Sequence, residues 1–207
     1  MNNTFYLVRN GITIYNESSI FTGKLDIPLS KKGIYQAIEL REREIDRINF
    51  CHVAYSSYLE RGFQTGLIIA GLAELFSIGG QIFLLHHKGK QKIDLIPDYR
   101  LAERHLGDLQ GIKKDELATI HNGKYKDRPD VTRSFTDKPD GGESFEDIEK
   151  LVASFFDDLS QIHEGKHILI STHNGPMKAS LKYFSNLPDQ DVLNFEFNPC
   201  EIYEFHK

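Results

Sequence analysis

A chain of 207 residues, 40% of them hydrophobic and 27% charged, is long enough to bury one substantial core and has the composition of an ordinary globular protein. Its net charge of -5 argues against nucleic acid or an anionic membrane as the main partner, so a basic site for an anion must be local. The sequence shows no membrane-length apolar run and no signal-peptide layout, and Cys51 and Cys200 lack metal-ligand spacing, so we expect a cytoplasmic protein with buried free thiols.

The first predicted element is a short buried strand over residues 5–8 that runs directly into Arg9, Asn10 and Gly11. An arginine followed closely by a glycine gives this strand end a fixed cation and lets a ligand approach the backbone. Residues 16–29 are then predicted to form a loop. The end of the first strand is therefore a candidate anion site.

Ser30 is predicted to cap an amphipathic helix, and a second strand is expected over residues 51–55. Residues 57–60 show a capping-box pattern, which predicts a helix that starts there and continues through Phe76. Arg61 would then lie in the first turn of this helix, behind the end of the second strand. From position alone, such an arginine is more simply interpreted as a solvated surface charge.

Two short strands are expected over residues 82–85 and 94–96, joined by a basic turn. The adjacent His86 and His87 would point to opposite faces of a strand, so no metal site is expected there. Further along, Glu103 stands between two arginines in a polar stretch. Such a group is usually an ion-pair cluster, and it becomes a candidate general acid where it lines a cleft.

Residues 111–140 are charged and are interpreted as a lid-like insertion in a single domain that spans residues 1–207, with a short helix over residues 113–121. Ser144 and Asp147 then form a capping box for a long amphipathic helix. The aromatic and aliphatic stripe of that helix is expected to face the core.

Residues 167–172 form a second apolar run, predicted to be a buried strand, which leads into His173 and a further helix. A loop over 187–198 and a strand over 201–205 complete the chain. The alternation of strands and helices predicts one α/β domain, a three-layer sandwich with a mainly parallel central sheet and helices on both faces. In that sheet Arg9 and His173 would meet at the carboxyl edge, where open α/β sheets bind ligands.

Six segments carry a resemblance, in this order along the chain: LVRNGIT, FTGKLDIPLSKKGIYQA, SSYLERGFQT, RLAERHLGDLQG, GGES and STHNGPMKA. In order and spacing they resemble the histidine phosphatase superfamily, over nearly the whole chain. The stretch ERHLGDLQGIKKDE is most similar to the cofactor-dependent phosphoglycerate mutase branch. One position departs from the family pattern, because Asn10 stands where the family has its nucleophilic histidine.

The resemblance implies a phosphoryl-transfer enzyme, a phosphatase or a phosphomutase, that acts on a small phosphorylated metabolite through a phosphohistidine. It implies that Glu103 is the general acid and base, and that Lys114 and Arg133 hold a substrate carboxylate. Two departures from the mutase pattern weaken phosphoglycerate as the substrate. Leu106 replaces a tyrosine of the mutases, and Thr132 precedes Arg133 where the mutases usually have a pair of arginines. The residues that the resemblance places around the phosphate are Arg9, Arg61, His173, Asn16, Thr22, Gly23 and Asn174.

The catalytic positions that the resemblance implies are Asn10, Glu103 and His173. A carboxamide nitrogen cannot replace imidazole as a nucleophile, because its lone pair is delocalised. Three explanations stay open. Asn10 was introduced into an active enzyme to trap a ligand, or the chain is a natural non-catalytic binder of a phosphorylated ligand, or an altered mechanism uses Glu103 or His173 with a different nucleophile.

No metal or organic cofactor is implied, and neither nucleic acid nor a membrane is expected as a partner. A homodimer through exposed apolar residues in the 76–85 segment remains an alternative to a monomer. The sequence leaves open the identity of the substrate and the choice between mutase and phosphatase.

Overall fold

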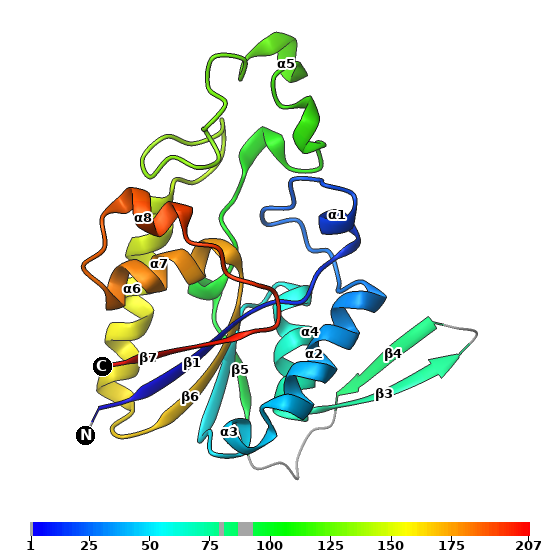
Figure 1. Cartoon of the computed structure of the whole chain (residues 1–207), viewed down its shortest axis with the longest axis vertical. Helices are drawn as coiled ribbons and strands as arrows, with labels where there is room; N and C mark the ends of the chain where they lie inside the picture. The colour runs from blue at the N-terminus through cyan, green and yellow to red at the C-terminus, as the bar shows by residue number, and fades with distance from the viewer. Residues whose placement is uncertain (1, 79–80, 87–92) are drawn as a thin grey trace.

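The computed structural model describes residues 2–78, 81–86 and 93–207, and the main sheet of this part has five strands in the order β5-β2-β6-β1-β7 (Figure 1). β5, β2, β6 and β1 run parallel, whereas β7 joins β1 antiparallel at the edge. This arrangement confirms the predicted α/β class with a mainly parallel sheet. The strands are β1 (Thr4–Arg9), β2 (Val53–Ser56), β5 (Leu95–Pro97), β6 (His167–Thr172) and β7 (Ile202–His206).

Helices cover both faces of this sheet, and α1 lies in the loop that follows β1 (Figure 1). The helix over residues 145–162 and the helix that follows β6 were both predicted. The helices are α1 (Ile14–Glu17), α2 (Lys31–Arg43), α3 (Ile45–Asn49), α4 (Glu60–Ala70), α5 (Ile120–Gly123), α6 (Phe145–Ile162), α7 (Asn174–Phe184) and α8 (Asp189–Asn194).

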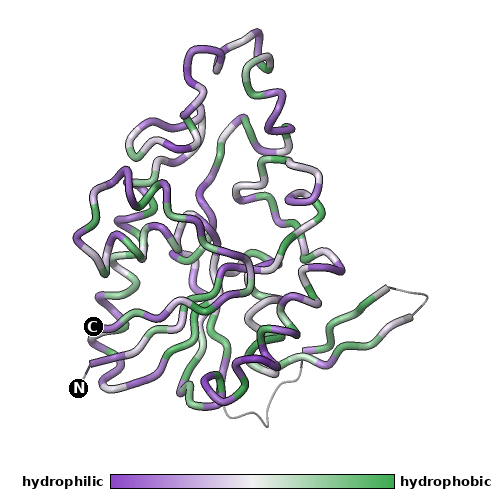
Figure 2. Tube along the Cα trace, viewed as in Figure 1, coloured by the Kyte–Doolittle hydropathy of each residue, from purple (hydrophilic) through white to green (hydrophobic). Residues whose placement is uncertain are grey.

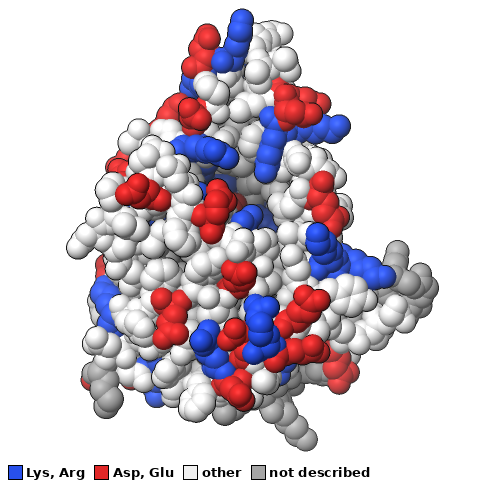
Figure 3. Space-filling model, in the orientation of Figure 1, with Lys and Arg blue, Asp and Glu red and all other residues white. Residues whose placement is uncertain are grey.

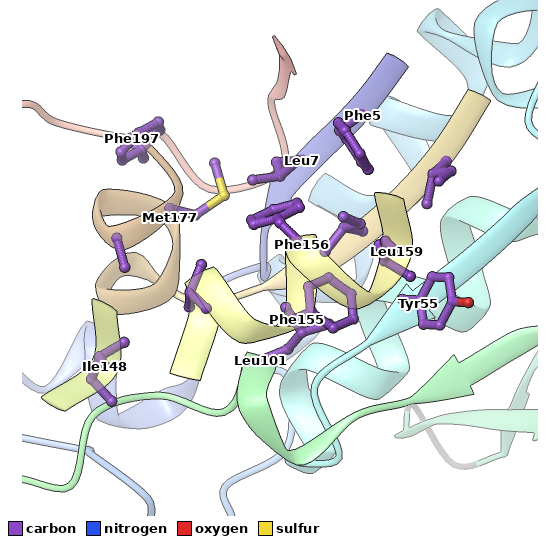
Figure 4. Packing of buried hydrophobic residues seen from close by; sticks show 14 residues of the cluster. Phe5, Leu7, Tyr55, Leu101, Ile148, Phe155, Phe156, Leu159, Met177 and Phe197 are labelled. Atoms are coloured by element: carbon purple, nitrogen blue, oxygen red, sulfur yellow. The ribbon is translucent and has the colours of Figure 1, made fainter. Parts of the chain in front are cut away.

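The side chains of β1 alternate between two hydrophobic clusters, as the two-residue period of a strand requires. Phe5 and Leu7 belong to the cluster under α6 and α7, and Figure 4 shows them beside Phe156 of α6. Tyr6 and Val8 belong to the cluster under α2, α3 and α4. The apolar stretches in Figure 2 accordingly run along the central strands, and the sheet separates two cores in a three-layer sandwich.

Two predicted helix starts are confirmed by their hydrogen bonds. The Ser30 hydroxyl accepts a bond from the backbone N–H of Gly33 at 3.2 Å. At α6, the Ser144 hydroxyl accepts from the N–H of Asp147, and the Asp147 carboxylate accepts from the N–H of Ser144. These bonds pair backbone donors that the first turn of a helix leaves free.

The predicted helix through Phe76 is wrong in its second half. α4 ends at Ala70, because Gly71 has a positive φ of 72° and closes the helix in a left-handed conformation. The following residues form β3 (Ala73–Ile78), which pairs antiparallel with β4 (Gln81–His86) in a separate two-stranded hairpin. An apolar run next to a glycine fits a buried helix and a hairpin strand equally well, since periodicity alone does not separate them.

The predicted capping box at residues 57–60 is also wrong. The Ser57 hydroxyl accepts from the N–H of Leu59, and the N–H of Glu60 donates to the carboxylate of Asp26 from a distant loop. A contact far away in sequence has replaced the local cap. Arg61 nevertheless lies in the first turn of α4, as expected.

Other differences lie in loops. α1 begins at Ile14 and extends to Glu17, into the segment predicted as a loop over 16–29, and the predicted loop over 187–198 contains α8. The polar stretch after residue 98 contains two short 3₁₀ turns. The helix expected over 113–121 is only a 3₁₀ turn, Lys114–Glu116, followed by α5. Of the basic turn expected at 86–92, His86 is the last residue of β4, and residues 87–92 lie outside the described residues.

The segment 111–140 forms the upper part of the molecule in Figure 1 and shares a small hydrophobic core with residues before it in the chain. Tyr125 is fully buried there, in one cluster with Phe21, Leu109 and Val131. The Tyr125 hydroxyl donates to the carboxylate of Asp108 at 2.5 Å. The cluster therefore joins this segment to the loop that follows β1.

Cys51 and Cys200 are buried free thiols, and burial raises the pKa of each to about 12. Both therefore stay in the unreactive thiol form at neutral pH. Among the described residues, no helix combines the length and apolar character that crossing a bilayer requires.

A close contact joins α2 to the chain after β1. A Cβ atom added to Gly33 would lie 2.1 Å from the carbonyl oxygen of Ile12, and one added to Gly11 would lie 2.5 Å from the carbonyl oxygen of Gly33. The backbones at the start of α2 and after Asn10 therefore touch directly.

We expect Gly33→Ala to destabilise the protein by about 1–3 kcal/mol, because the added methyl group forces α2 away from this segment. Helix propensity alone predicts the opposite, a gain of roughly 1 kcal/mol. Denaturant unfolding of the variant and the parent measures the difference. A variant as stable as the parent, or more stable, would contradict the contact.

Candidate functional site

The parallel pairing of β1 with β6 brings two strand ends together at the carboxyl edge of the sheet. Arg9 is the register partner of Thr172, and the N–H of Asn10 donates to the carbonyl of Thr172 at 2.8 Å. Asn10 and His173 therefore follow directly from neighbouring strands. The expectation that Arg9 and His173 meet at this edge is confirmed by the register.

A pocket of about 290 Å³ opens at this edge, below the 111–140 segment. Figure 3 shows a hollow on this face with basic side chains inside it and at its mouth. His173 alone among the predicted site residues does not line the pocket. The predicted residues that line it are Arg9, Asn10, Asn16, Thr22, Gly23, Arg61, Glu103, Lys114, Arg133 and Asn174.

His173 lies behind Asn10 and is 1% exposed. Its Nδ1 atom lies 2.8 Å from the Oδ1 atom of Asn10, and the Asn10 amide nitrogen donates to the carbonyl of Gly11 at 2.7 Å. The amide oxygen can only accept, so the hydrogen-bond network assigns the proton of His173 to Nδ1. Asn10 therefore holds His173 in one orientation and one tautomer.

Burial lowers the pKa of His173 well below its ordinary value of 6.5, and the charges of Arg61 and Arg9 lower it further. The ring is therefore neutral at physiological pH. Its Nε2 atom carries a lone pair and has no hydrogen-bond partner among the described residues. That edge of the ring lies close to Gly62, where an added Cβ would be 3.2 Å from Nε2.

Backbone carbonyl groups hold the guanidinium groups of two arginines at the pocket. Arg61 is 3% exposed and donates to the carbonyls of Gly23 and Leu25, at 2.7 and 2.8 Å. Arg9 donates to the carbonyl of Phe197 at 2.6 Å. Burial lowers the pKa of both guanidinium groups, and the Glu103 charge opposes that shift. Carbonyl oxygens fix these cations without neutralising them.

Glu103 lies at the N-terminus of α7. Its carboxylate accepts from the N–H of Gly175 at 3.1 Å and from the N–H of Arg104 at 2.8 Å. Both donors are backbone N–H groups, so the fold fixes the position of this carboxylate. The contact is tight, because a Cβ atom at Gly175 would lie 2.3 Å from the Glu103 Oε1 atom.

Polar atoms without partners mark the pocket wall. Within the described part of the chain, Thr22 Oγ1, Asn174 Oδ1 and an Nη1 atom of Arg104 are buried and unpaired, and all three residues line the pocket. Buried polar groups are normally paired, so unpaired ones indicate atoms that a ligand or water would satisfy.

Arg104 was not assigned a role from the sequence, although it belongs to the cluster around Glu103. It is 4% exposed, its guanidinium stacks on Phe145 at 4.1 Å, and it donates to the carbonyl of Thr132 at 2.5 Å. Burial lowers the pKa of Arg104 to about 10, and it stays charged at neutral pH. The sequence did offer a signal for Arg104 as a site residue, because Arg104 directly follows Glu103, a candidate catalytic residue.

Lys178 and Glu196 also line the pocket and were missed. Lys178 stands four residues after Asn174, and this spacing places both on the same face of a helix. That pattern was readable in the sequence. Glu196 follows α8, a helix that was itself not predicted, and no sequence signal connected it to the site.

The pocket thus collects six basic side chains and two acidic ones in a chain of net charge -5. The basic residues are Arg9, Arg61, Arg104, Lys114, Arg133 and Lys178, and the acidic ones are Glu103 and Glu196. Such a site attracts an anion, and arginine forks suit the oxygens of a phosphate or carboxylate. Asn10 brings no nucleophilic atom to it.

A family model described as the histidine phosphatase superfamily (branch 1) matches residues 5–77 and 83–206. The chain belongs to this superfamily. It is 29% identical to a 2,3-bisphosphoglycerate-dependent phosphoglycerate mutase of Gloeothece citriformis, over 92% of this chain and 88% of that protein. The chain is thus a phosphatase- or phosphomutase-type member of the superfamily.

Two solved structures share the fold. The mycobacterial glucosyl-3-phosphoglycerate phosphatase in complex with VO3 aligns with a TM-score of 0.72 and 22% identity, over 97% of this chain and 91% of that chain. The phosphoserine phosphatase of Entamoeba histolytica in complex with 3-phosphoglyceric acid aligns with a TM-score of 0.75 and 22% identity, over 98% and 89%.

We expect the His173 ring to stay neutral as the pH is lowered from 8 through its ordinary pKa of about 6.5, because burial depresses its folded-state pKa well below that value. The unfolded chain protonates this ring near the ordinary value. The free energy of unfolding should therefore decrease as the pH falls below about 6.5, because the unfolded chain binds a proton at this ring and the folded chain does not.

Histidine ring NMR spectra across this pH range provide the measurement, and a His173→Gln variant identifies the signal. A His173 signal that titrates near its ordinary pKa would refute the buried neutral tautomer.

Proposed function

We propose that this pocket binds the phosphoryl group of a small phosphorylated metabolite, and that the chain has the site of a phosphatase or phosphomutase of its superfamily. One observation carries the proposal: pocket cations are anchored by carbonyl oxygens and stand beside unpaired buried polar atoms. Arg9, Arg61, Thr22 and Asn174 would contact the phosphoryl oxygens. Asn16 and Gly23 complete the wall of the loop that follows β1.

We further propose that Asn10 occupies the position of the superfamily's nucleophilic histidine. It follows β1 directly after Arg9, lies against His173 and lines the pocket. A carboxamide cannot form a phosphoryl intermediate, so the covalent route is lost in this form. Phosphate binding is retained, because the groups that would hold the anion lie on other residues.

Glu103 would protonate the leaving oxygen in a form that carries a nucleophile. An alternative is that Glu103 activates water directly, since it lines the pocket and two backbone N–H groups hold its carboxylate in place. A third candidate, a non-catalytic phospho-ligand binder, leaves Glu103 without a proton-transfer role.

Lys114 and Arg133 would hold a second acidic group of the ligand at the far end of the pocket. The phosphoglycerate mutase relative and the 3-phosphoglyceric acid complex support an acidic phosphorylated metabolite. We also propose that residues 1–207 form one domain, in which the 111–140 segment acts as a lid over this end.

We expect Asn10→His to create phosphate release or mutase activity that the parent chain lacks, since it restores a neutral imidazole beside Arg9 and His173. The two proteins are assayed in parallel against sugar phosphates, phosphoglycerates and nucleotides. Activity in the Asn10 form would indicate another nucleophile. A silent histidine variant that still binds phosphate would favour the binding-protein alternative.

We expect Thr22→Val to weaken binding of inorganic phosphate by roughly 10- to 100-fold, because a hydrogen bond to a charged group contributes about 1.5–3 kcal/mol. Stability should be unchanged or higher, since the Thr22 hydroxyl is buried without a partner. Calorimetric titration and thermal unfolding measure the two effects. Thr22→Ser keeps a hydroxyl and should retain most of the affinity, whereas equal phosphate affinity in Thr22→Val would exclude this contact.

A further inference from the structure

A glutamate outside the pocket joins two segments that carry site residues. The Glu143 carboxylate accepts from the Nζ atom of Lys24 at 2.7 Å and from the backbone N–H of His105 at 2.7 Å. Lys24 belongs to the loop that follows β1, and His105 follows Glu103 and Arg104 in the chain. One carboxylate thus bridges the loop proposed to bind the phosphoryl group and the segment of the candidate general acid.

On the loop side, the bridge ends between the two anchors of Arg61. The neighbours of Lys24 in the chain are Gly23 and Leu25. Their carbonyl groups accept from the Arg61 guanidinium at 2.7 and 2.8 Å. A movement of Lys24 would therefore move both groups that orient this buried arginine.

On the acid side, the bridge holds the backbone. The N–H of Glu143 donates to the carbonyl of His105 at 2.8 Å, so this one residue pairs both backbone groups of His105. Gln110 adds a second link, because its Oε1 atom accepts from the N–H groups of Lys24 and Leu106, at 2.7 and 3.2 Å. The loop and the acid segment are therefore joined at two places.

The ion pair of this bridge is partly buried, since the Lys24 and Glu143 side chains are 26% and 27% exposed. Water and salt screen such a pair less than a fully exposed one. Lys24, His105 and Glu143 are themselves not part of the pocket lining. They would act on a ligand only through the neighbours that they hold.

We propose that Glu143 is a positioning residue, whose carboxylate fixes the anchors of Arg61 relative to the segment of Glu103. This inference rests on the proposed phosphate-binding function and gives a role to the GGES segment. Without the bridge, the two segments would take up several relative positions, and the geometry that binds phosphate would be populated less often. Affinity would fall although no group in contact with the ligand is lost.

Electrostatics alone makes a different prediction. Lys24 brings a positive charge and Glu143 a negative one to the surroundings of an anion site. Loss of the lysine charge should then weaken phosphate binding, and loss of the glutamate charge should strengthen it. A positioning role predicts that both changes weaken binding, because each breaks the same bridge. The sign of the effect at Glu143 separates the two explanations.

The experiment compares the parent chain with Glu143→Gln, Lys24→Met and the double variant, by calorimetric titration with inorganic phosphate. Glutamine keeps the shape of the side chain and an acceptor for one partner only. We expect each single change to lower the affinity by roughly threefold or more. The double variant should bind no more weakly than the weaker single variant, since one bridge is broken once. Lys24→Arg keeps the ion pair and should retain most of the affinity.

Lys182→Met is the matched control for the loss of a partly buried ion pair. Lys182 lies 2.6 Å from the carboxylate of Asp189, its side chain is 26% exposed, and it is not part of the pocket lining. Thermal unfolding of every variant measures the structural effect of the lost pair. Lys182→Met should keep the phosphate affinity of the parent.

The outcomes distinguish the two proposals. If the parent does not bind phosphate, the proposed phosphate site itself fails. If the parent binds and Glu143→Gln binds equally or more tightly, only the positioning role is overturned. A loss of affinity that Lys182→Met shares, at a similar loss of thermal stability, identifies a general structural effect and likewise overturns that role.

Discussion

The register between β1 and β6 is the constraint on which the site depends. Parallel pairing places Arg9 beside Thr172, so the next residues along both strands, Asn10 and His173, are necessarily neighbours. A shift of one residue would turn the apolar side chains of β1 to the wrong cores. Burial of the alternating residues on both faces therefore fixes the position of the polar residues at the strand ends, and the two cores specify the geometry of the pocket.

The second constraint is electrostatic. Four pocket cations are held by backbone carbonyls, which orient a cation and leave its charge available. Had carboxylates held them, the local charge would cancel and an anion would gain little. The unliganded protein bears the mutual repulsion of these groups, and an anion relieves it. A ligand that binds only the folded state stabilises the fold in proportion to its occupancy. The cations are Arg9, Arg61, Arg104 and Lys178.

The sequence was sufficient for the parts of this molecule that local patterns determine. The apolar runs at residues 5–8 and 167–172 predicted strands, and Ser30 and Ser144 predicted helix starts, since the physical cause lies within a few residues. Arg61 lies in the first turn of α4 as expected, yet its burial depends on carbonyls in the loop after β1. Its place in the site needed the family resemblance.

Predictions failed where distant contacts decided the outcome. The start of α4 is set by Asp26, thirty-four residues away, and the apolar residues after Gly71 find their partners in β4 rather than in a continued helix. Lys178 was not predicted as a site residue, and its helical spacing from Asn174 does not reveal whether the lysine is buried. Its burial depends on α8, which covers it and supplies the carbonyl of Leu193. Roles at the site remain predictions from the resemblance.

The hydrogen bonds of Asn10 limit which residues the fold can accept at position 10. Its amide donates to Gly11 and accepts from His173, so both buried partners are satisfied. An apolar residue would leave each partner unpaired, at a cost of about 1–3 kcal/mol per group. Asparagine and neutral histidine share the ability to donate from one atom and accept at another. A histidine here can still donate to Gly11 from one ring nitrogen, but the lone pair of its other nitrogen can either accept from His173 or attack phosphorus. Exchange would therefore give up one buried hydrogen bond when the nucleophile acts. Stability and nucleophilic chemistry would thus compete for the same lone pair at position 10 of the proposed site.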